Sequence, residues 1–414
     1  MALILNIIFY IFVFLSLYVQ VFFFITFFEN RKKIVIRDGR TKLRYYPKVT
    51  IAVPCWNEEN TVEKTVRSLF ELNYPKDKVQ IFLIDDGSTD NTSNVLNKFV
   101  NYSNIKIFHK NNGGKHTALN LGLENSDTEY FGCLDADSLV DREALVRIMS
   151  YFEKDPTNMA VVPSVTVYNP KNFVQYAQKA EYNMGVYFKK MFGFLGAIHV
   201  TPGPFTIFRR KVFDDLGKYR QGHNTEDMEI AFRMQKNQYK IEHCNDAFIY
   251  TNTPKTVKKL YKQRVRWIYG FINNILDYKE VLGKKKYGNF AFFTLPAGII
   301  SIFSVSFLFG RIVYDICHYL YIKLLKFNTV GFDFNFKHIS FDPFFINTQV
   351  FVFLVYVLYF FVIFAIIFGQ KMAKEKSVFP LKMLYYFPVF SVVAPLWLLK
   401  GIYNTIVSRK PAWR

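Results

Sequence analysis

The sequence has long apolar stretches on both sides of a central region of mixed polarity. Residues 3–28 contain no charged side chain, and neither do residues 289–310 or 343–370. A shorter apolar stretch, 383–399, contains Pro388 and Pro395. Because a helix crosses a bilayer with about 20 apolar residues, the first three stretches predict membrane spans. Buried helices of a soluble protein are the alternative, but uncharged stretches of this length are rare in soluble domains.

The first apolar stretch is predicted to stay in the membrane. It is longer and more aromatic than the core of a signal peptide, and no small-residue cleavage site follows it. No Lys or Arg precedes it, whereas basic residues follow it, which predicts an outer N-terminus and a cytosolic central region. Three further complete crossings would place Arg409, Lys410 and Arg414 outside, against the same rule. A broken or interfacial final segment at Pro388 and Pro395 would resolve this conflict.

The region from about residue 45 to residue 280 has the pattern of one α/β domain. Apolar and β-branched runs predict four strands, at 49–53, 79–84, 105–108 and 130–134. Helical spacing predicts helices at 61–72 and 91–100. This alternation predicts a parallel sheet with crossover helices, in which ligands bind beyond the carboxyl ends of the strands. Pro54, Trp56 and Glu58 follow the first predicted strand and are therefore candidate ligand contacts.

The net charge of +20 would also suit a nucleic-acid-binding protein. Much of the excess flanks the apolar stretches, at Arg31 to Arg40 and at Lys284 to Lys286. Such residues usually mark the cytoplasmic side of a membrane and its anionic headgroups. No recognition-helix or zinc-finger pattern accompanies them, so we expect a lipid bilayer and no nucleic acid as partner. The four cysteines have no metal-ligand spacing and are expected to be packing residues.

Carboxylates follow two of the predicted strands. Asp135 and Asp137 come after the fourth strand and offer hard oxygen ligands to Mg²⁺ or Mn²⁺, with substrate phosphates and water completing the shell. A loop with two solvated acids is the alternative, and the pair alone is a weak signal. Asp85 and Asp86 end the second strand, where they suit either a nucleoside contact or a turn that caps the next helix.

Three further groups complete the candidate site. Lys115 follows two glycines and precedes a predicted helix, so it suits phosphate oxygens, although a flexible turn is the alternative. Glu226 and Asp227 open an amphipathic helix, where acids are favourable in any case; a carboxylate is also what sugar transfer needs to deprotonate an acceptor hydroxyl. The last group lies on a basic amphipathic segment that also suits lipid headgroups. It consists of Gln263, Arg266 and Trp267. The arginine suits a diphosphate, and the indole suits a sugar ring.

As an ordered set, these motifs resemble the membrane-embedded family 2 glycosyltransferases, such as cellulose, chitin, hyaluronan and poly-N-acetylglucosamine synthases. The matching stretches extend from about residue 49 to residue 270 and are 53–59, 85–90, 112–120, 135–137, 201–205, 225–227 and 263–267. Trp56 stands where this family usually has tyrosine, and His116 follows Lys115 where a small residue is common. Neither difference removes a catalytic group.

The resemblance implies a GT-A fold and inverting transfer from a UDP-sugar. It places Asp85 or Asp86 and Lys115 at the nucleotide, and Asp135 and Asp137 at the diphosphate and its metal. It makes Asp227 the general base. Glu226 and Asp137 are the other two catalytic candidates. Arg266 would hold the diphosphate, and Trp267 would stack at the acceptor end, with Gln263 in the same motif. In this family that motif accompanies processive synthesis, with the polymer leaving through a channel between the membrane helices.

The favoured interpretation is therefore a processive synthase of a β-linked polysaccharide, of the poly-N-acetylglucosamine type because the chain has few spans and no C-terminal regulatory domain. It would reside in the plasma (inner) membrane as a multi-pass protein. Its expected partners are a UDP-sugar, the growing polysaccharide and possible accessory or export subunits. A single-transfer enzyme acting on a lipid carrier and an inactive scaffold or export subunit are the alternatives. The expected domains are a membrane helix (1–30), a cytosolic GT-A domain ending in an interfacial helix (31–280) and membrane or interfacial helices (281–414).

Overall fold

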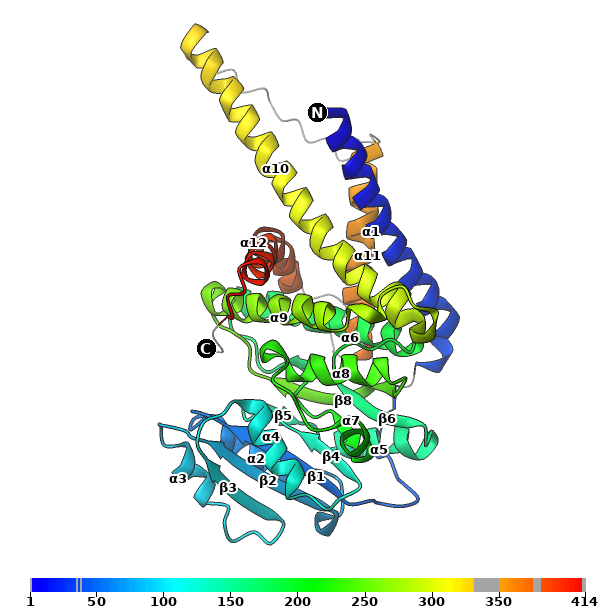
Figure 1. Ribbon diagram of the computed structural model, residues 1–414, viewed down its shortest axis with the longest axis vertical. Helices are drawn as coiled ribbons and strands as arrows, with labels where there is room; N and C mark the ends of the chain where they lie inside the picture. The colour runs from blue at the N-terminus through cyan, green and yellow to red at the C-terminus, as the bar shows by residue number, and fades with distance from the viewer. Residues whose placement is uncertain (1, 35, 38, 331–349, 375–380, 412–414) are drawn as a thin grey trace. The chain divides into compact units, whose positions relative to one another are not determined.

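The computed structural model describes residues 2–34, 36–37, 39–330, 350–374 and 381–411 (Figure 1). The chain folds into two compact units. The first consists of residues 1–24 and 297–364, and the second of residues 25–296 and 365–414. The second unit contains the sheet and every predicted site residue.

Helices make up the described part of the first unit. They are most of α1 (Ala2–Asn30), most of α10 (Leu295–Val330) and the first part of α11 (Val350–Met372). Phe12 contacts Phe307 between α1 and α10, and Phe24 contacts Phe364 between α1 and α11. Many large apolar side chains of α1 and α10 are nevertheless exposed, as lipid-facing helices require.

Within the described residues, three helices are long and apolar enough to cross a membrane: Ile4–Lys33, Phe290–Leu325 and Leu381–Ile406. The predicted stretch 289–310 is only the first part of its helix, because a short π-helix (Phe290–Thr294) leads directly into α10. The predicted stretch 343–370 falls partly on α11, and residues 343–349 lie outside the described residues.

The second unit is built on an eight-stranded mixed sheet in the order β3-β2-β1-β4-β7-β6-β8-β5. Strands β1 to β4 are parallel to one another, β7 and β5 run antiparallel to their neighbours, and β6 pairs parallel with β8. The strands are β1 (Val49–Cys55), β2 (Val79–Asp86), β3 (Ile105–Lys110), β4 (Tyr130–Cys133), β5 (Ser138–Val140), β6 (Asn158–Val167), β7 (Ile207–Arg209) and β8 (Lys240–Thr251). The four predicted strands and their parallel pairing are confirmed.

Both faces of the sheet are covered, because successive residues of a strand point to opposite sides. In β1, Ile51 and Val53 belong to one buried cluster and Ala52 to another. The first cluster includes residues of α2 (Val62–Phe70), α3 (Thr92–Asn97) and α5 (Ala144–Lys154). The second includes residues of α4 (Lys115–Glu124), α7 (Lys211–Leu216) and α8 (Glu226–Lys236). Because β1 pairs parallel with both β2 and β4, the carboxyl ends of these three strands lie along one edge of the sheet.

Three longer helices complete the second unit: α6 (Phe173–Phe194), α9 (Val257–Asp277) and α12 (Tyr386–Ile406). Helix α12 packs closely on α9, since a Cβ added to Gly401 would overlap Ile268. The expected break at Pro388 and Pro395 is not observed, because α12 continues through both. Pro388 lies in the first turn, where its missing N–H has no helical partner to lose. Whether this helix is interfacial stays a prediction.

Candidate active site

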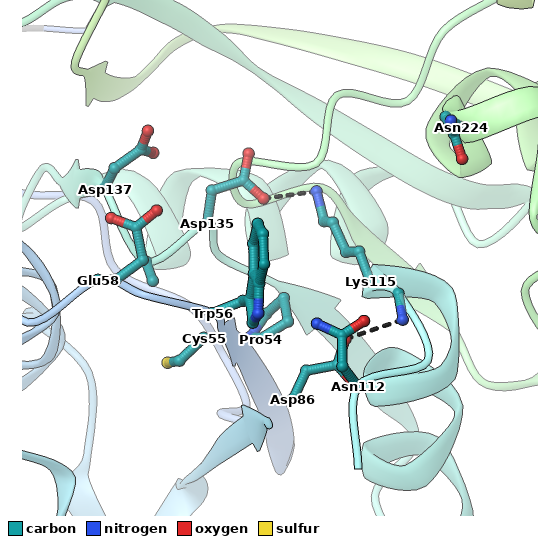
Figure 2. Close-up of a pocket in the computed structure, with 12 residues that line it drawn as sticks. Pro54, Cys55, Trp56, Glu58, Asp86, Asn112, Lys115, Asp135, Asp137 and Asn224 are labelled. Atoms are coloured by element: carbon teal, nitrogen blue, oxygen red, sulfur yellow. Dashed lines mark hydrogen bonds and ion pairs between the residues drawn. The ribbon is translucent and has the colours of Figure 1, made fainter. Parts of the chain in front are cut away.

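A cavity of about 280 Å³ lies where β1, β2 and β4 end (Figure 2). It contains seven of the predicted site residues. They are Pro54, Trp56, Glu58, Asp86, Lys115, Asp135 and Asp137, joined by Cys55, Asn112, Gly114, Ala136 and Asn224. The strand order explains this gathering, since parallel neighbours deliver the residues after their last positions to the same edge.

Lys115 links the two sides of this cavity. It is the first residue of α4, and Figure 2 shows its side chain extending to Asp135, whose Oδ1 lies 2.5 Å from Lys115 Nζ. Its ammonium also lies 3.2 Å from Glu226 Oε1. Burial lowers the pKa of Lys115, but the Asp135 and Glu226 carboxylates outweigh it and hold that pKa well above its usual value. A fixed positive charge therefore faces the cavity.

Asp86 shapes the loop that precedes Lys115. Its carboxylate accepts the backbone N–H groups of Gly113 at 3.0 Å and Gly114 at 2.9 Å, and an ion pair joins it to Lys110 at 2.5 Å. Gly87 has a φ of 71° and an added Cβ would lie 2.6 Å from the Asn112 backbone nitrogen. Only glycine fits that approach of two loops.

Asp85 lies behind the cavity wall. Its carboxylate accepts the Ser88 N–H at 2.9 Å and lies 3.3 Å from His109 Nδ1. Asp85 therefore holds a turn without capping the next helix, α3, whereas Asp86 lines the cavity.

A second cavity of about 390 Å³ shares Asp135 and Asp137 with the first. It is lined by three more predicted residues, Asp227, Gln263 and Trp267. Residues of α6 form another part of its wall, including Glu181, Tyr182 and Lys189, and the 202–204 segment forms another. The two aspartates therefore stand at the junction of two spaces, one lined by Lys115 and the other by Asp227.

The carboxyl group of Asp227 has a raised pKa. Burial and the adjacent Glu226 raise its pKa to about 6, although Lys115 and Arg266 act in the opposite direction. Its backbone carbonyl accepts the Thr201 N–H at 3.1 Å, which ties the start of α8 to the 201–205 segment. At neutral pH the carboxylate is ionised yet holds a proton more readily than an ordinary aspartate.

Helix α9 lines the second cavity with two residues of its motif and contacts the wall of the first cavity through a third. Trp267 and Gln263 line the second cavity. Arg266 instead donates from Nη1 to the Asn224 carbonyl at 2.8 Å, and Asn224 lines the first cavity. Burial lowers the pKa of Arg266, against the effect of Glu226 and Asp227, which raise it. Arg266 thus supports the wall of the first cavity through the loop that carries Asn224.

The donor set at the junction fits a hard divalent cation. Asp135 and Asp137 are carboxylates on one short loop, and both face the space between the cavities. No group of three or more His, Cys, Asp or Glu side chains suited to a metal occurs among the described residues. Mg²⁺ and Mn²⁺ do not need one where substrate phosphates supply the remaining oxygens. Asp135 pairs with Lys115, and Asp137 accepts a hydrogen bond from the Ser138 hydroxyl at 3.1 Å, so both carboxylates are candidate ligands.

The structure adds residues that the sequence reasoning did not name as site residues. Gly203 lies against the Lys115 ammonium and the Asp135 carboxylate, so closely that a Cβ added there would overlap Lys115 Nζ. Asn112 and Gly203 belong to stretches that supported the resemblance, so a signal for them existed. Glu181 and Lys189 lie on α6, for which the motifs gave no signal. Of the predicted residues, Asp85, Glu226 and Arg266 line neither cavity.

Four of the eight non-glycine residues with positive φ in the described part of the chain line these cavities or lie next to residues that do. Asn57, Phe205, His223 and Asn224 have positive φ angles of 55°, 65°, 56° and 65°. Phe205 is fully buried, and its N–H donates to the Cys133 carbonyl at 2.6 Å. Such conformations cost about 1–3 kcal/mol each and persist where the surrounding structure enforces them.

Known proteins resemble this chain in sequence and in fold. Residues 50–217 match the sequence profile of glycosyl transferase family 2. A poly-beta-1,6-N-acetyl-D-glucosamine synthase of Staphylococcus epidermidis is 31% identical over 241 residues, which are 58% of this chain and 58% of that protein. The enzyme of that name from Staphylococcus aureus strain MSSA476 is 32% identical over 224 residues, 54% of each chain. This chain therefore spans just over half the length of these curated relatives.

A solved structure shows the same fold over most of the chain. It is the mannosyltransferase PcManGT from Pyrobaculum calidifontis in complex with GDP-Man and Mn²⁺, with a TM-score of 0.61 and 15% identity. The likeness covers 96% of this chain and 99% of that one. The predicted GT-A fold is confirmed. Residues 50–217, which match the glycosyl transferase family 2 profile, carry every residue that lines the first cavity except Asn224.

Proposed function

We propose that this protein is a processive, inverting glycosyltransferase that builds a β-linked polysaccharide from a UDP-sugar. The observation that carries the proposal is the pair of cavities that meet at Asp135 and Asp137. One has the groups that suit a nucleotide diphosphate and the other has the groups that suit a sugar acceptor. Transfer between two bound molecules needs this arrangement, because the reacting atoms must be held in contact.

In this proposal the first cavity holds the donor. Trp56, Asp86 and Lys115 line this cavity; Trp56 and Asp86 would contact the base and ribose, and Lys115 would offer its ammonium to the phosphates. Asp137, with Asp135, would hold Mg²⁺ or Mn²⁺ against the diphosphate. When bound, such an ion neutralises charge on the leaving UDP.

The transfer step assigns the proton to Asp227. Its carboxylate takes the proton from the acceptor hydroxyl while that oxygen bonds to the anomeric carbon and the bond to UDP breaks. Its raised pKa suits this role, because a general base works best when its pKa lies near the working pH. Lys115 is fixed by Asp135 and Glu226, so it need not move when charge develops on the leaving group.

The acceptor cavity supports repeated transfer. Trp267 offers an apolar ring to the sugar that has just been added, and Gln263 offers an amide beside it. Because the homologous synthases are named for poly-β-1,6-N-acetyl-D-glucosamine, we propose N-acetylglucosamine as the sugar. We further propose export through helices that cross the plasma membrane, with residues 31–280 in the cytosol.

The test is to incubate the purified full-length protein with a panel of radiolabelled UDP-sugars and to size the product. We expect incorporation from UDP-N-acetylglucosamine into a long polymer, and no product from the Asp227→Asn protein. A single sugar attached to a lipid would replace this proposal with the lipid-carrier alternative. No incorporation from any UDP-sugar, by protein that still binds UDP, would favour the inactive scaffold.

A further inference from the structure

The indole of Trp267 is covered by a second side chain of its own helix. The Arg264 guanidinium lies 4.0 Å from the centroid of the Trp267 ring. Residues three apart on a helix are neighbours, so α9 brings the two side chains onto the same face. A guanidinium is planar and stacks on an aromatic face, which a lysine ammonium does not do equally well.

Arg264 is itself held from two sides. Its Nη1 donates to Gln263 Oε1 at 2.7 Å, and its Nη2 donates to the Glu181 carboxylate of α6. Only 4% of the Arg264 side chain is exposed. Glu181, Gln263 and Trp267 all line the second cavity, whereas Arg264 does not. Arg264 therefore lies behind the cavity wall and contacts three residues that form it.

We propose that Arg264 is a positioning residue for the acceptor site, and that Glu181 anchors it. The inference rests on the proposed function of the second cavity as the acceptor site. Arg264 fixes the plane of the Trp267 ring and the direction of the Gln263 amide, so that both meet the terminal sugar in one geometry. The segment between Gln263 and Trp267 thereby acts with α6 as a single rigid wall.

Stability alone does not account for this arrangement. The Arg264–Glu181 pair is partly buried, with 4% of the Arg264 side chain and 24% of the Glu181 side chain exposed. A pair removed from water is weak support for stability, because desolvating two charges costs about as much as their attraction returns. Apolar side chains between α6 and α9 would pack at lower cost. What an ion pair adds is a fixed geometry, and here the fixed groups line the cavity beside Asp227.

The test compares Arg264→Met, Arg264→Lys and Glu181→Gln with Arg209→Met. Arg209 is a matched control outside both cavities: its guanidinium lies 5.1 Å from the Tyr130 ring centroid and donates to Glu129 at 2.7 Å. The first measurement is the KM for a short β-1,6-linked N-acetylglucosamine oligosaccharide, together with product length, kcat and UDP affinity. A lost guanidinium–indole contact should raise that KM about 2- to 30-fold and shorten the polymer, with UDP affinity unchanged. Arg264→Lys should restore little of the wild-type KM, because lysine keeps the positive charge but lacks the planar guanidinium that stacks on the indole.

The second measurement does not require turnover. Protein containing 5-fluorotryptophan gives ¹⁹F resonances from its four tryptophans, and Trp267→Phe assigns that of Trp267. This resonance should shift in Arg264→Met and Glu181→Gln but not in Arg209→Met. An unshifted Trp267 resonance, or an unchanged KM with full-length product, would overturn the inference. A wild-type protein that adds a single sugar would refute processivity alone, because the ring position and the KM would still report on Arg264.

Discussion

The acidity of Asp227 should set the lower pH limit of activity. Burial and Glu226 raise its pKa to about 6, and a base acts in its ionised form. Activity is therefore expected above pH 6 and should be lost as the pH falls through 6. At pH 5, about one carboxyl in ten would be ionised, so kcat/KM should fall about tenfold from its plateau. An unshifted aspartate, with a pKa of about 3.9, would remain more than nine-tenths ionised at that pH.

The assay is the initial rate of transfer from radiolabelled UDP-sugar between pH 4.5 and pH 8, with UDP affinity measured at each pH. Glu226→Gln should move the midpoint to lower pH, because the Glu226 charge raises the pKa of Asp227. Lys115→Met should move it to higher pH, because the Lys115 charge lowers that pKa. Asp227→Asn should lower the plateau about 10²- to 10⁴-fold and abolish the acidic limb. A midpoint near pH 4, or an acidic limb that persists in Asp227→Asn, would refute the reasoning.

The same shift predicts a cost in stability. Between pH 4 and pH 6 the folded protein keeps a proton on Asp227 that the unfolded chain releases, so stability falls as the pH rises through that window. A shift of about two units corresponds to about 3 kcal/mol at most, since each unit is worth about 1.4 kcal/mol. Asp227→Asn should therefore raise the thermal midpoint in detergent at pH 7.5 and leave it nearly unchanged at pH 4.

Three further changes test other parts of the site. Asp137→Asn should lower transfer at least about 100-fold, and excess EDTA should silence the wild type; full activity in EDTA would contradict a metal role. Gly203→Ala should raise the KM for UDP-sugar, because the added methyl displaces the Lys115 ammonium. Gly310→Ala is its control, since a Cβ there meets nothing within 4 Å. Trp267→Ala should shorten or abolish the polymer with UDP affinity kept, and full-length polymer from that variant would argue against an acceptor role for the ring.

The sequence was sufficient for the parallel half of the sheet. Strands β1 to β4 are apolar runs between clear helical or turn signals, so local pattern and tertiary role agree. The mixed half of the sheet, formed by β5 to β8, was not predicted, because its strands depend on distant partners. Strand β7 has only three residues. Strand β8 contains Asp246, which is buried and forms an ion pair with Arg37 at 2.9 Å. The sequence around Asp246 does not indicate that this charged residue lies in the interior.

The sequence predicted which residues gather at the candidate site, but it did not predict how they divide between two cavities and the residues behind them. Carboxylates after apolar strands and a lysine after two glycines have physical reasons that one sequence displays. The sequence could not show which of Asp85 and Asp86 lines the cavity. That depends on which carboxylate accepts the backbone N–H groups of residues 113 and 114, and the folded chain shows that it is Asp86. Glu181 could not be found, because its partner Arg264 is 83 positions away and only folding brings them together.

The charges around Asp227 link the proposed metal site to the proposed base. The ionisable groups that act on its pKa include two cations, Lys115 and Arg266, and two anions, Glu226 and Asp135. With Asp227 itself and Asp137, the junction carries two positive and four negative charges, an excess of two negative charges. A divalent cation at Asp137 would cancel that excess, and a diphosphate alone would enlarge it. The junction should therefore favour joint entry of cation and nucleotide, while burial and the adjacent Glu226 charge keep the pKa of the Asp227 carboxylate raised.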